Sequence, residues 1–313
     1  MRITEDRRNL LKAATMYYSE GKTQAEIAKK MNISRPVISK MLQLARQEGI
    51  VEIYVKDENA HSIALALEIE KKYQLNDVIV VPKSIEFSKS TIKHNVAKAA
   101  VSYLITHLKK DTKIGLSWGT TIAEVIDEMP YLSKPGITIH PLVGGIQSQH
   151  VYLDANHLTF LLAEKLSAQC SYFYAPALAD TIELKELLAE STVVETAMSD
   201  ARKVELAIIG VGNPLGNTTW EELGYIEKKE LIQANNQGIV GDAVASLFDE
   251  TGQTVMTDLT KRMMGMTIED LIQIPNVVAI ASGSTKGTSI QALLNNHVIN
   301  TLIIDQSIAE QLN

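Results

Sequence analysis

The sequence predicts an α/β protein in two parts: a small helical domain over residues 1–57 and a large α/β domain over residues 58–313. Three observations lead to this prediction. Apolar residues recur with helical spacing in the first part. In the second part, short apolar runs typical of buried strands alternate with amphipathic segments, as in proteins with a largely parallel sheet. Residues 1–50 hold ten Lys or Arg and five Asp or Glu, a net +5, which leaves −12 for the rest.

The composition is that of an ordinary soluble globular protein. The chain has 313 residues, of which 45% are hydrophobic and 21% charged, enough for a large core. No apolar run approaches the ~18 residues that a membrane helix needs, and the first residues lack the apolar core of a signal peptide. Cys170, the single cysteine, cannot form an internal disulfide, which fits a reducing compartment. We therefore expect a cytoplasmic protein with no membrane partner.

Three helices are predicted in the first part. A helix over residues 5–20 ends at Gly21, and two shorter helices joined by a tight turn follow it. Thr23 and Glu26 form a capping box that starts the first of the shorter helices. Asn32 then occupies the turn, because asparagine tolerates a positive φ better than most other residues.

The third helix is predicted from Ser34 to about residue 47. Ser34 is a favourable N-cap, and Pro36 lies in the first turn, where its missing N–H costs little. This spacing is typical of a helix-turn-helix, in which the second helix enters the major groove. The alternative is an ordinary helical hairpin, but small Ala28 at the helix crossing and the local positive charge favour DNA binding. The residues expected to contact DNA are Thr23, Gln24, Ser34, Arg35, Pro36, Val37, Ser39 and Lys40.

Two segments follow the helix-turn-helix. Residues 50–55 alternate apolar and polar side chains and predict a strand, a wing beside the helices. Residues 60–73 return to helical spacing. This helix could be a dimerising linker or could pack on its own domain, and two heptads are too few to decide between these readings.

Strands and helices alternate through the second part, which predicts a largely parallel sheet covered by helices. The predicted strands are 76–81, 113–117, 137–143, 205–211, 276–281 and 300–304. The predicted helices are 91–109, 121–129, 155–168, 182–199, 242–248, 288–295 and 307–312.

Small amide-rich loops follow several of the predicted strands, where open α/β sheets bind their ligands. Such loops present backbone N–H groups and the positive end of a helix dipole to an anion. Lys286 adds a positive charge at one loop, and Asp242 and Asp305 would accept hydrogen bonds from hydroxyls. Phosphate donors beside hydroxyl acceptors describe a phosphorylated sugar. The alternative is that glycine and serine simply make the turns of an α/β fold.

The sequence predicts no catalytic residue, metal or cofactor. The seven histidines have no metal-ligand spacing, and His140, in a predicted strand, is expected to be a satisfied core or site-lining group. The rival prediction is a sugar-phosphate isomerase or deaminase-like enzyme that carries a DNA-binding module. Asp242 or Asp305 could serve it as a general base, but no second acid–base partner can be named. A third hypothesis is an architectural DNA-binding protein without a ligand. The large, acidic α/β domain argues against it.

Motifs over nearly the whole chain resemble the SorC family of bacterial transcriptional regulators, also called the sugar-binding or deoxyribonucleoside-regulator-like family. Any one of these motifs alone is weak evidence, but the whole set is highly specific for this family. The motifs are YYSEGKTQAEIAKKMNISRPVISKML, GLSWGTT, PLVGG, IIGVG, LGYI, VGDAVASLFD, IASGSTKGTSIQALL and LIIDQSIAEQL.

This resemblance implies a winged-helix-like DNA-binding domain and a Rossmann-like effector domain, similar in fold to sugar-phosphate isomerases, that senses its ligand without converting it. It also implies a homo-oligomer, a tetramer, with operator DNA and a phosphorylated sugar as partners. Val143, which precedes Gly144 and Gly145, occupies the main variable position of the family. The resemblance therefore does not identify the sugar. The residues that the resemblance assigns to the effector pocket are Ser117, Trp118, Gly119, Thr120, Thr121, Gly144, Gly145, Asp242, Lys286 and Asp305.

Overall fold

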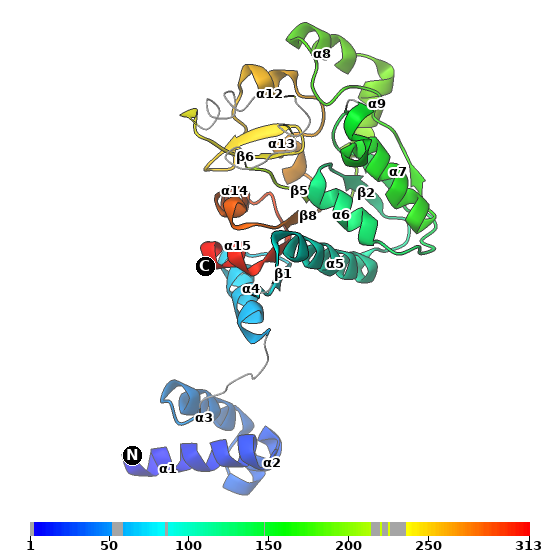
Figure 1. Ribbon diagram of the computed structural model, residues 1–313. Coiled ribbons are helices and arrows are strands. Elements are labelled where there is room, and N and C mark those ends of the chain that lie inside the picture. The colour runs from blue at the N-terminus through cyan, green and yellow to red at the C-terminus, as the bar shows by residue number, and fades with distance from the viewer. Residues whose placement is uncertain are drawn as a thin grey trace. The chain divides into compact units, whose positions relative to one another are not determined.

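The computed structural model describes residues 3–51, 59–84, 87–146, 148–213, 220, 225 and 236–313 (Figure 1). The chain divides into two compact units, Met1–Ala60 and His61–Asn313. Most of the strand predicted at residues 50–55 lies outside the described residues. Within the described residues, no helix combines the length and apolar character needed to cross a membrane.

The first unit contains the three predicted helices. Helix α1 (Ile3–Ala14) continues into a π-helical turn, η1 (Thr15–Ser19), and α2 (Gln24–Met31) and α3 (Arg35–Gln47) follow. Their inner faces meet in a small apolar core, because residues spaced three or four apart share one helical face. The buried members of this core are Ala13, Met16, Ile27, Ile38 and Leu42.

The local signals at both short helices are confirmed. Thr23 Oγ1 accepts from Glu26 N at 3.3 Å, and Glu26 Oε2 accepts from Thr23 N at 2.8 Å, which completes the capping box. Asn32 ends α2 with φ 56° and ψ 43°, the left-handed conformation that the turn requires. Ser34 has the extended backbone of an N-cap, although its side chain makes no capping hydrogen bond.

A seven-stranded, fully parallel sheet forms the centre of the second unit, in the order β1-β9-β8-β5-β2-β3-β4. The strands are β1 (Asp77–Val81), β2 (Lys113–Leu116), β3 (Thr138–Pro141), β4 (Gln169–Cys170), β5 (Leu206–Gly210), β8 (Asn276–Ala281) and β9 (Thr301–Asp305). From β2 the chain builds outward through β3 to β4, and from β5 it builds in the other direction through β8. The strand order therefore reverses between the neighbouring strands β2 and β5. Their carboxyl ends form the topological switch point, where open α/β sheets bind ligands.

Two apolar cores lie on the two faces of the sheet because side chains alternate along each strand. In β5, Ile208 belongs to one core, and Ala207 and Ile209 belong to the other. The first core is covered by α5 (Lys89–His107), α6 (Thr120–Glu128) and α7 (Ala155–Leu166), of which α5 and α6 lie side by side in Figure 1. The second is covered by α4 (Ala60–Tyr73), α14 (Gly287–Asn295) and α15 (Gln306–Leu312). The α/β prediction with a parallel sheet is confirmed.

Helix α4 has two different faces. Leu65 and Ile69 are buried in the core of the body, so the helix packs on its own domain. Ile63 and Leu67 are 56% and 59% exposed. Among the described residues of the second unit, nothing therefore covers this apolar strip of α4.

The helix predicted over residues 242–248 is wrong. The segment forms an antiparallel hairpin of β6 (Ile239–Ala243) and β7 (Ser246–Asp249). Every residue from 241 to 248 is buried, so the apolar pattern has neither the helical nor the strand period. The hairpin turn also lacks the glycine or asparagine that usually marks such turns in a sequence. Val244 occupies the position with positive φ, at 46°.

The single helix predicted over residues 182–199 is also wrong. Two helices occupy the region, α8 (Ile182–Ala189) and α9 (Thr192–Ala201), because Ser191 starts a new helix by accepting from Val194 N through its Oγ. Short elements without a strong periodic signal were not predicted. They are β4, η2 (Ser148–Leu153), α12 (Asp258–Arg262), α13 (Ile268–Ile272) and η3 (Ser284–Lys286).

Candidate functional site

The outward face of α3 carries the side chains expected to meet DNA. Arg35, Ser39 and Lys40 are exposed, and Val37 is 46% exposed although it is apolar. Ile38 and Leu42 point inward and fix the helix on α1 and α2. The core therefore leaves this polar and basic face free for a partner.

A shallow depression lies where α2 begins. Lys22, Thr23, Gln24 and Arg35 line it together with Tyr17, Gly21 and Ala25. It brings two cationic side chains, of which Lys22 is ion-paired with Glu20, to the N-terminal turn of an eight-residue helix, whose dipole favours an anion. Thr23 and Gln24 thus line the same depression as Arg35.

At the switch point of the body, the loop after β2 leads directly into α6. Gly119 precedes the helix with φ 101°, in the left-handed region that favours glycine, and has no side chain to cap it. Among the described residues, no acceptor bonds the first-turn N–H groups of Thr120 and Thr121. Trp118 and Ser117 are buried, and Trp118 packs edge-on against Trp220 with ring centroids 4.6 Å apart.

Asp242 is brought to the same switch point by a bridge between the hairpin and the loop after β5. Gly212 N donates to Asp242 O at 2.8 Å, and Asp242 N donates to Gly212 O at 3.3 Å. The expectation that Asp242 precedes a helix is therefore wrong, because it lies inside β6. It reaches the site through this nonlocal pairing.

Asp242 and Lys286 form a poorly solvated acid–base pair. Burial raises the pKa of the Asp242 carboxyl to about 6, although Lys286 and Trp220 each favour its charged form. Burial likewise lowers the pKa of Lys286, and Asp242 opposes that shift. No nitrogen–oxygen distance within 4.0 Å joins the two side chains, so they influence each other without a close ion pair. Trp220 Nε1, also buried, lies toward the Asp242 carboxyl but makes no hydrogen bond of normal geometry in the described part of the chain.

Asp305 holds the loop that carries Lys286. Its Oδ2 accepts from Gly283 N at 2.6 Å, and its Oδ1 accepts from Ser307 N at 2.8 Å, which caps α15. The side chain is 1% exposed. The carboxylate that the sequence places near hydroxyl groups therefore bonds to two backbone N–H groups of its own chain.

The double glycine is packed between two other segments. Gly144 N donates to Met264 O at 3.0 Å, and Gly145 N donates to Ala175 O at 2.8 Å. A Cβ on Gly144 would lie 2.5 Å from Pro176 O. Both N–H groups are thus already bonded to backbone carbonyls, and the glycines allow a close backbone approach.

His140 is buried in β3 and satisfied, as expected. Its Nδ1 lies 2.9 Å from Ser171 Oγ and its Nε2 lies 3.3 Å from Thr138 Oγ1, and burial lowers its pKa. No group of three or more His, Cys, Asp or Glu side chains suited to a metal occurs in the described part of the chain. Sequence reasoning missed Trp220 and the part played by Gly212, since neither has a local signal.

Comparison with known proteins identifies the family. The family model Sugar-bind, a sugar-binding domain, matches residues 57–312. The deoxyribonucleoside regulator of Bacillus subtilis is 29% identical over 306 residues, which cover 96% of each chain. Among solved structures, the full-length sorbitol operon regulator SorC of Klebsiella pneumoniae superposes with a TM-score of 0.74 and 25% identity over 98% of both chains. A DeoR family transcriptional regulator of Listeria monocytogenes gives a TM-score of 0.75 and 29% identity over 81% of this chain and all of its own. The chain belongs to the SorC family of transcriptional regulators, and its large body is the sugar-binding domain of that family.

Proposed function

We propose that this regulator of carbohydrate metabolism binds operator DNA through residues 1–57 and responds to a phosphorylated sugar that binds within residues 58–313. The observation that carries the effector half is the pair of Asp242 and Lys286 at the switch point. Asp242 is buried and Lys286 is half-buried, and the loss of solvent disfavours the charged form of each. A ligand that brings an anion to Lys286 and hydroxyl groups to Asp242 would satisfy both.

The other effector candidates take distinct roles in this proposal. Thr120 and Thr121 have N–H groups at the start of α6 that no acceptor in the described part of the chain bonds, and the helix dipole there favours a phosphate. Trp220 Nε1 favours the charged form of Asp242 and so supports this acceptor. Asp305 acts by positioning the loop of Lys286. Ser117, Trp118, Gly119, Gly144 and Gly145 shape the walls.

The names of relatives support a polyhydroxylated effector. They include a sorbitol operon regulator, an erythritol catabolism regulatory protein and a deoxyribonucleoside regulator. Because these relatives are regulators, we propose that the ligand is sensed and not converted. A carboxyl with a pKa of about 6 would also suit a general base, so a turnover assay on the bound sugar phosphate is the direct test of the enzyme alternative.

For the DNA half, we propose that α3 enters the major groove. Arg35 would reach a guanine edge or a phosphate, and Ser39 and Lys40 would make further base or phosphate contacts. The depression lined by Lys22, Thr23 and Gln24 would receive a backbone phosphate. Ser34, Pro36 and Val37 lie at the start of α3, the end of a recognition helix that contacts base edges.

A single helix-turn-helix domain of this size usually needs a second copy to contact a useful length of DNA. We propose a homo-oligomer, a tetramer, located in the cytoplasm with its operator. The exposed apolar strip of α4, formed by Ile63 and Leu67, supports association between copies.

A thermal-shift panel of phosphorylated sugars, each beside its unphosphorylated form, tests the effector. A ligand at about 100 times its Kd adds roughly 2.7 kcal/mol to the free energy of unfolding. We expect one phosphorylated sugar to raise Tm while its free sugar does not, and Lys286→Gln to abolish the difference. A free sugar that stabilises the protein as much as its phosphate would contradict the role of Lys286.

A further inference from the structure

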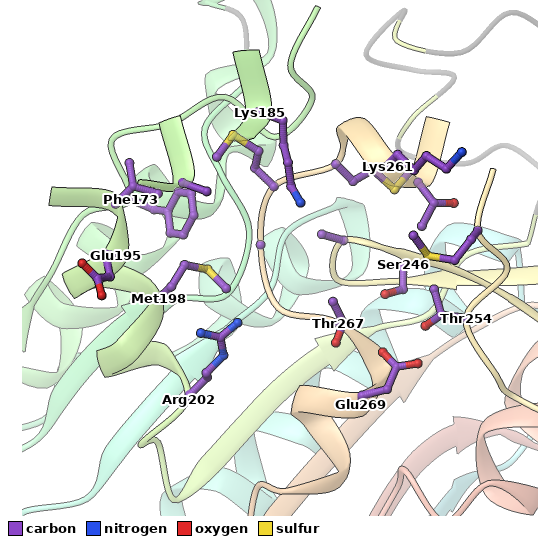
Figure 2. A pocket seen from close by; sticks show the side chains of 18 residues that line it. Phe173, Lys185, Glu195, Met198, Arg202, Ser246, Thr254, Lys261, Thr267 and Glu269 are labelled. Carbon is purple, nitrogen blue, oxygen red and sulfur yellow. The ribbon is translucent and has the colours of Figure 1, made fainter. Parts of the chain in front are cut away.

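A second cavity, of about 420 Å3, lies in the body between α8 and α9 on one side and the β6–β7 hairpin with α12 and α13 on the other (Figure 2). None of the ten effector candidates lines it. Its volume falls in the range of cavities that hold small organic molecules. The proposed effector therefore leaves this cavity unused.

One side of the cavity is apolar and adaptable. Phe173, Met263 and Met264 are nearly fully buried, and Met198 packs against them from α9. Figure 2 shows Phe173 and Met198 on the same side of the open space. Methionine side chains are flexible and polarisable, so they adjust to differently shaped hydrocarbon groups.

Two cations point into the same space from different elements. Figure 2 shows the ammonium of Lys185, on α8, and the guanidinium of Arg202, after α9, directed toward the open centre. Within the described residues, the side-chain ammonium of Lys185 makes neither a hydrogen bond nor an ion pair. Arg202 Nε donates to Asp270 Oδ1 at 2.9 Å, which orients the guanidinium and leaves its terminal NH2 groups available.

The facing wall carries hydroxyl groups, one acid and one further cation, Lys261 of α12, whose ammonium is directed away from the open centre in Figure 2. Ser246 Oγ already accepts from Ile268 N, and Thr267 Oγ1 accepts from Asp270 N. Thr254 Oγ1 is buried and lies toward the Glu269 carboxylate, without a hydrogen bond of normal geometry among the described residues. Glu269 lies beside Thr267 in Figure 2, away from Lys185. On the opposite side Glu195 of α9 also lines the cavity, and Figure 2 shows its carboxylate directed away from the open centre. An acidic group of a ligand is therefore drawn to Lys185 and Arg202 and away from Glu269.

We propose that this cavity is a second ligand site, which binds a small amphipathic organic anion. The acid group lies between Lys185 and Arg202, and the hydrocarbon body lies against Phe173, Met198 and Met264. A sugar phosphate does not fit this description, because it has too little apolar surface to cover the methionines. The site thus serves a ligand of another chemical class than the effector.

Fluorescence titration of the full chain with 1-anilinonaphthalene-8-sulfonate, an amphipathic aromatic anion, tests the site. Neutral N-phenyl-1-naphthylamine is the matched uncharged probe. We expect saturable sulfonate binding that weakens about tenfold in Lys185→Gln, the loss of one charge-assisted contact, while the neutral probe binds unchanged. Met198→Trp should displace both probes by filling the cavity. Lys203→Gln, a nearby lysine outside the cavity, should change neither.

Two outcomes would overturn the proposal: no saturable sulfonate binding by the wild-type chain, or equal binding by wild type and Lys185→Gln. The thermal shift with phosphorylated sugars should persist in Lys185→Gln. Loss of the probe alone therefore reports on this cavity, and loss of the sugar response alone reports on the effector site.

Discussion

The carboxylate of Asp242 lies against the bare α-carbon of Gly212. A Cβ on Gly212 would overlap Asp242 Oδ1, so no other residue fits there without moving the acid. The two backbones also bond to each other in both directions. A glycine after β5 thereby fixes the position of the buried carboxylate in β6, 30 residues later in the chain.

Gly212→Ala should therefore weaken the effector response. The added methyl group displaces the Asp242 carboxylate, and we expect phosphorylated-sugar affinity to fall about tenfold or more, since a buried charge-assisted hydrogen bond is lost. Operator affinity without effector should not change. Gly210→Ala is the matched control, because a Cβ there meets its nearest atoms at 3.7 Å, an ordinary contact. Equal sugar affinities of the two variants would refute the link.

Asp242→Ala should abolish the effector response and leave operator binding intact. The carboxylate is the acceptor that we propose for the sugar hydroxyls, whereas the DNA contacts lie in the other unit. Operator binding measured across a range of phosphorylated-sugar concentrations checks this. A variant that responds at the same concentrations as wild type would remove Asp242 from the effector site.

Asp242 should also make stability depend on pH. Its pKa rises from 3.8 unfolded to about 6 folded, so between these values the folded chain binds the extra proton. The free energy of unfolding therefore decreases as pH rises through this window, by up to about 3 kcal/mol in total. Asp242→Asn removes the ionisation, so it should be more stable than wild type at pH 7.5 and lose most of that advantage at pH 4. Urea unfolding at both pH values measures the difference. A constant difference would show that Asp242 ionises normally.

Features that depend on neighbouring residues could be predicted from the sequence, and features that depend on distant partners could not. The capping box of Thr23 and Glu26 and the left-handed Asn32 are local, and both were predicted. The bonds of Gly144 to Met264 and of Asp305 to Gly283 join segments far apart in the chain. The spacing of apolar residues does not indicate which distant segments will bond to each other. The sequence therefore predicts ligand contacts for Gly144 and Asp305, where the structure has hydrogen bonds within the chain.

The β6–β7 hairpin illustrates the same limit. Its residues are buried on both faces, which removes the alternation that distinguishes a strand from a helix. Asp242 is nevertheless a candidate from the sequence, because the Gly241–Asp242 step is one of the small loops expected at the ligand edge of the sheet and because the family resemblance assigns it to the effector pocket. The residue could be predicted where its secondary structure could not.

Thr23→Ala should destabilise α2 by about 1 kcal/mol, the usual cost of losing an N-cap. The amides of α2 should then exchange with solvent roughly fivefold faster, if they exchange by local opening. Thr23→Ser keeps an acceptor for Glu26 N and should exchange like wild type. If the serine variant exchanges as fast as the alanine variant, the capping hydrogen bond does not stabilise the helix.

Arg35→Ala should weaken operator binding, because Arg35 is exposed at the first turn of α3 and next to the depression at α2. If Arg35 reads a base, the loss is about 1–3 kcal/mol and specificity relaxes at one position of the site. If it contacts only a phosphate, affinity falls similarly on all sequences and the salt dependence becomes shallower. An operator selected from random oligonucleotides, titrated at several salt concentrations, distinguishes the two. Lys203→Ala removes a positive charge from the body and should leave both quantities unchanged. Unchanged operator affinity in Arg35→Ala would exclude this residue from the DNA interface.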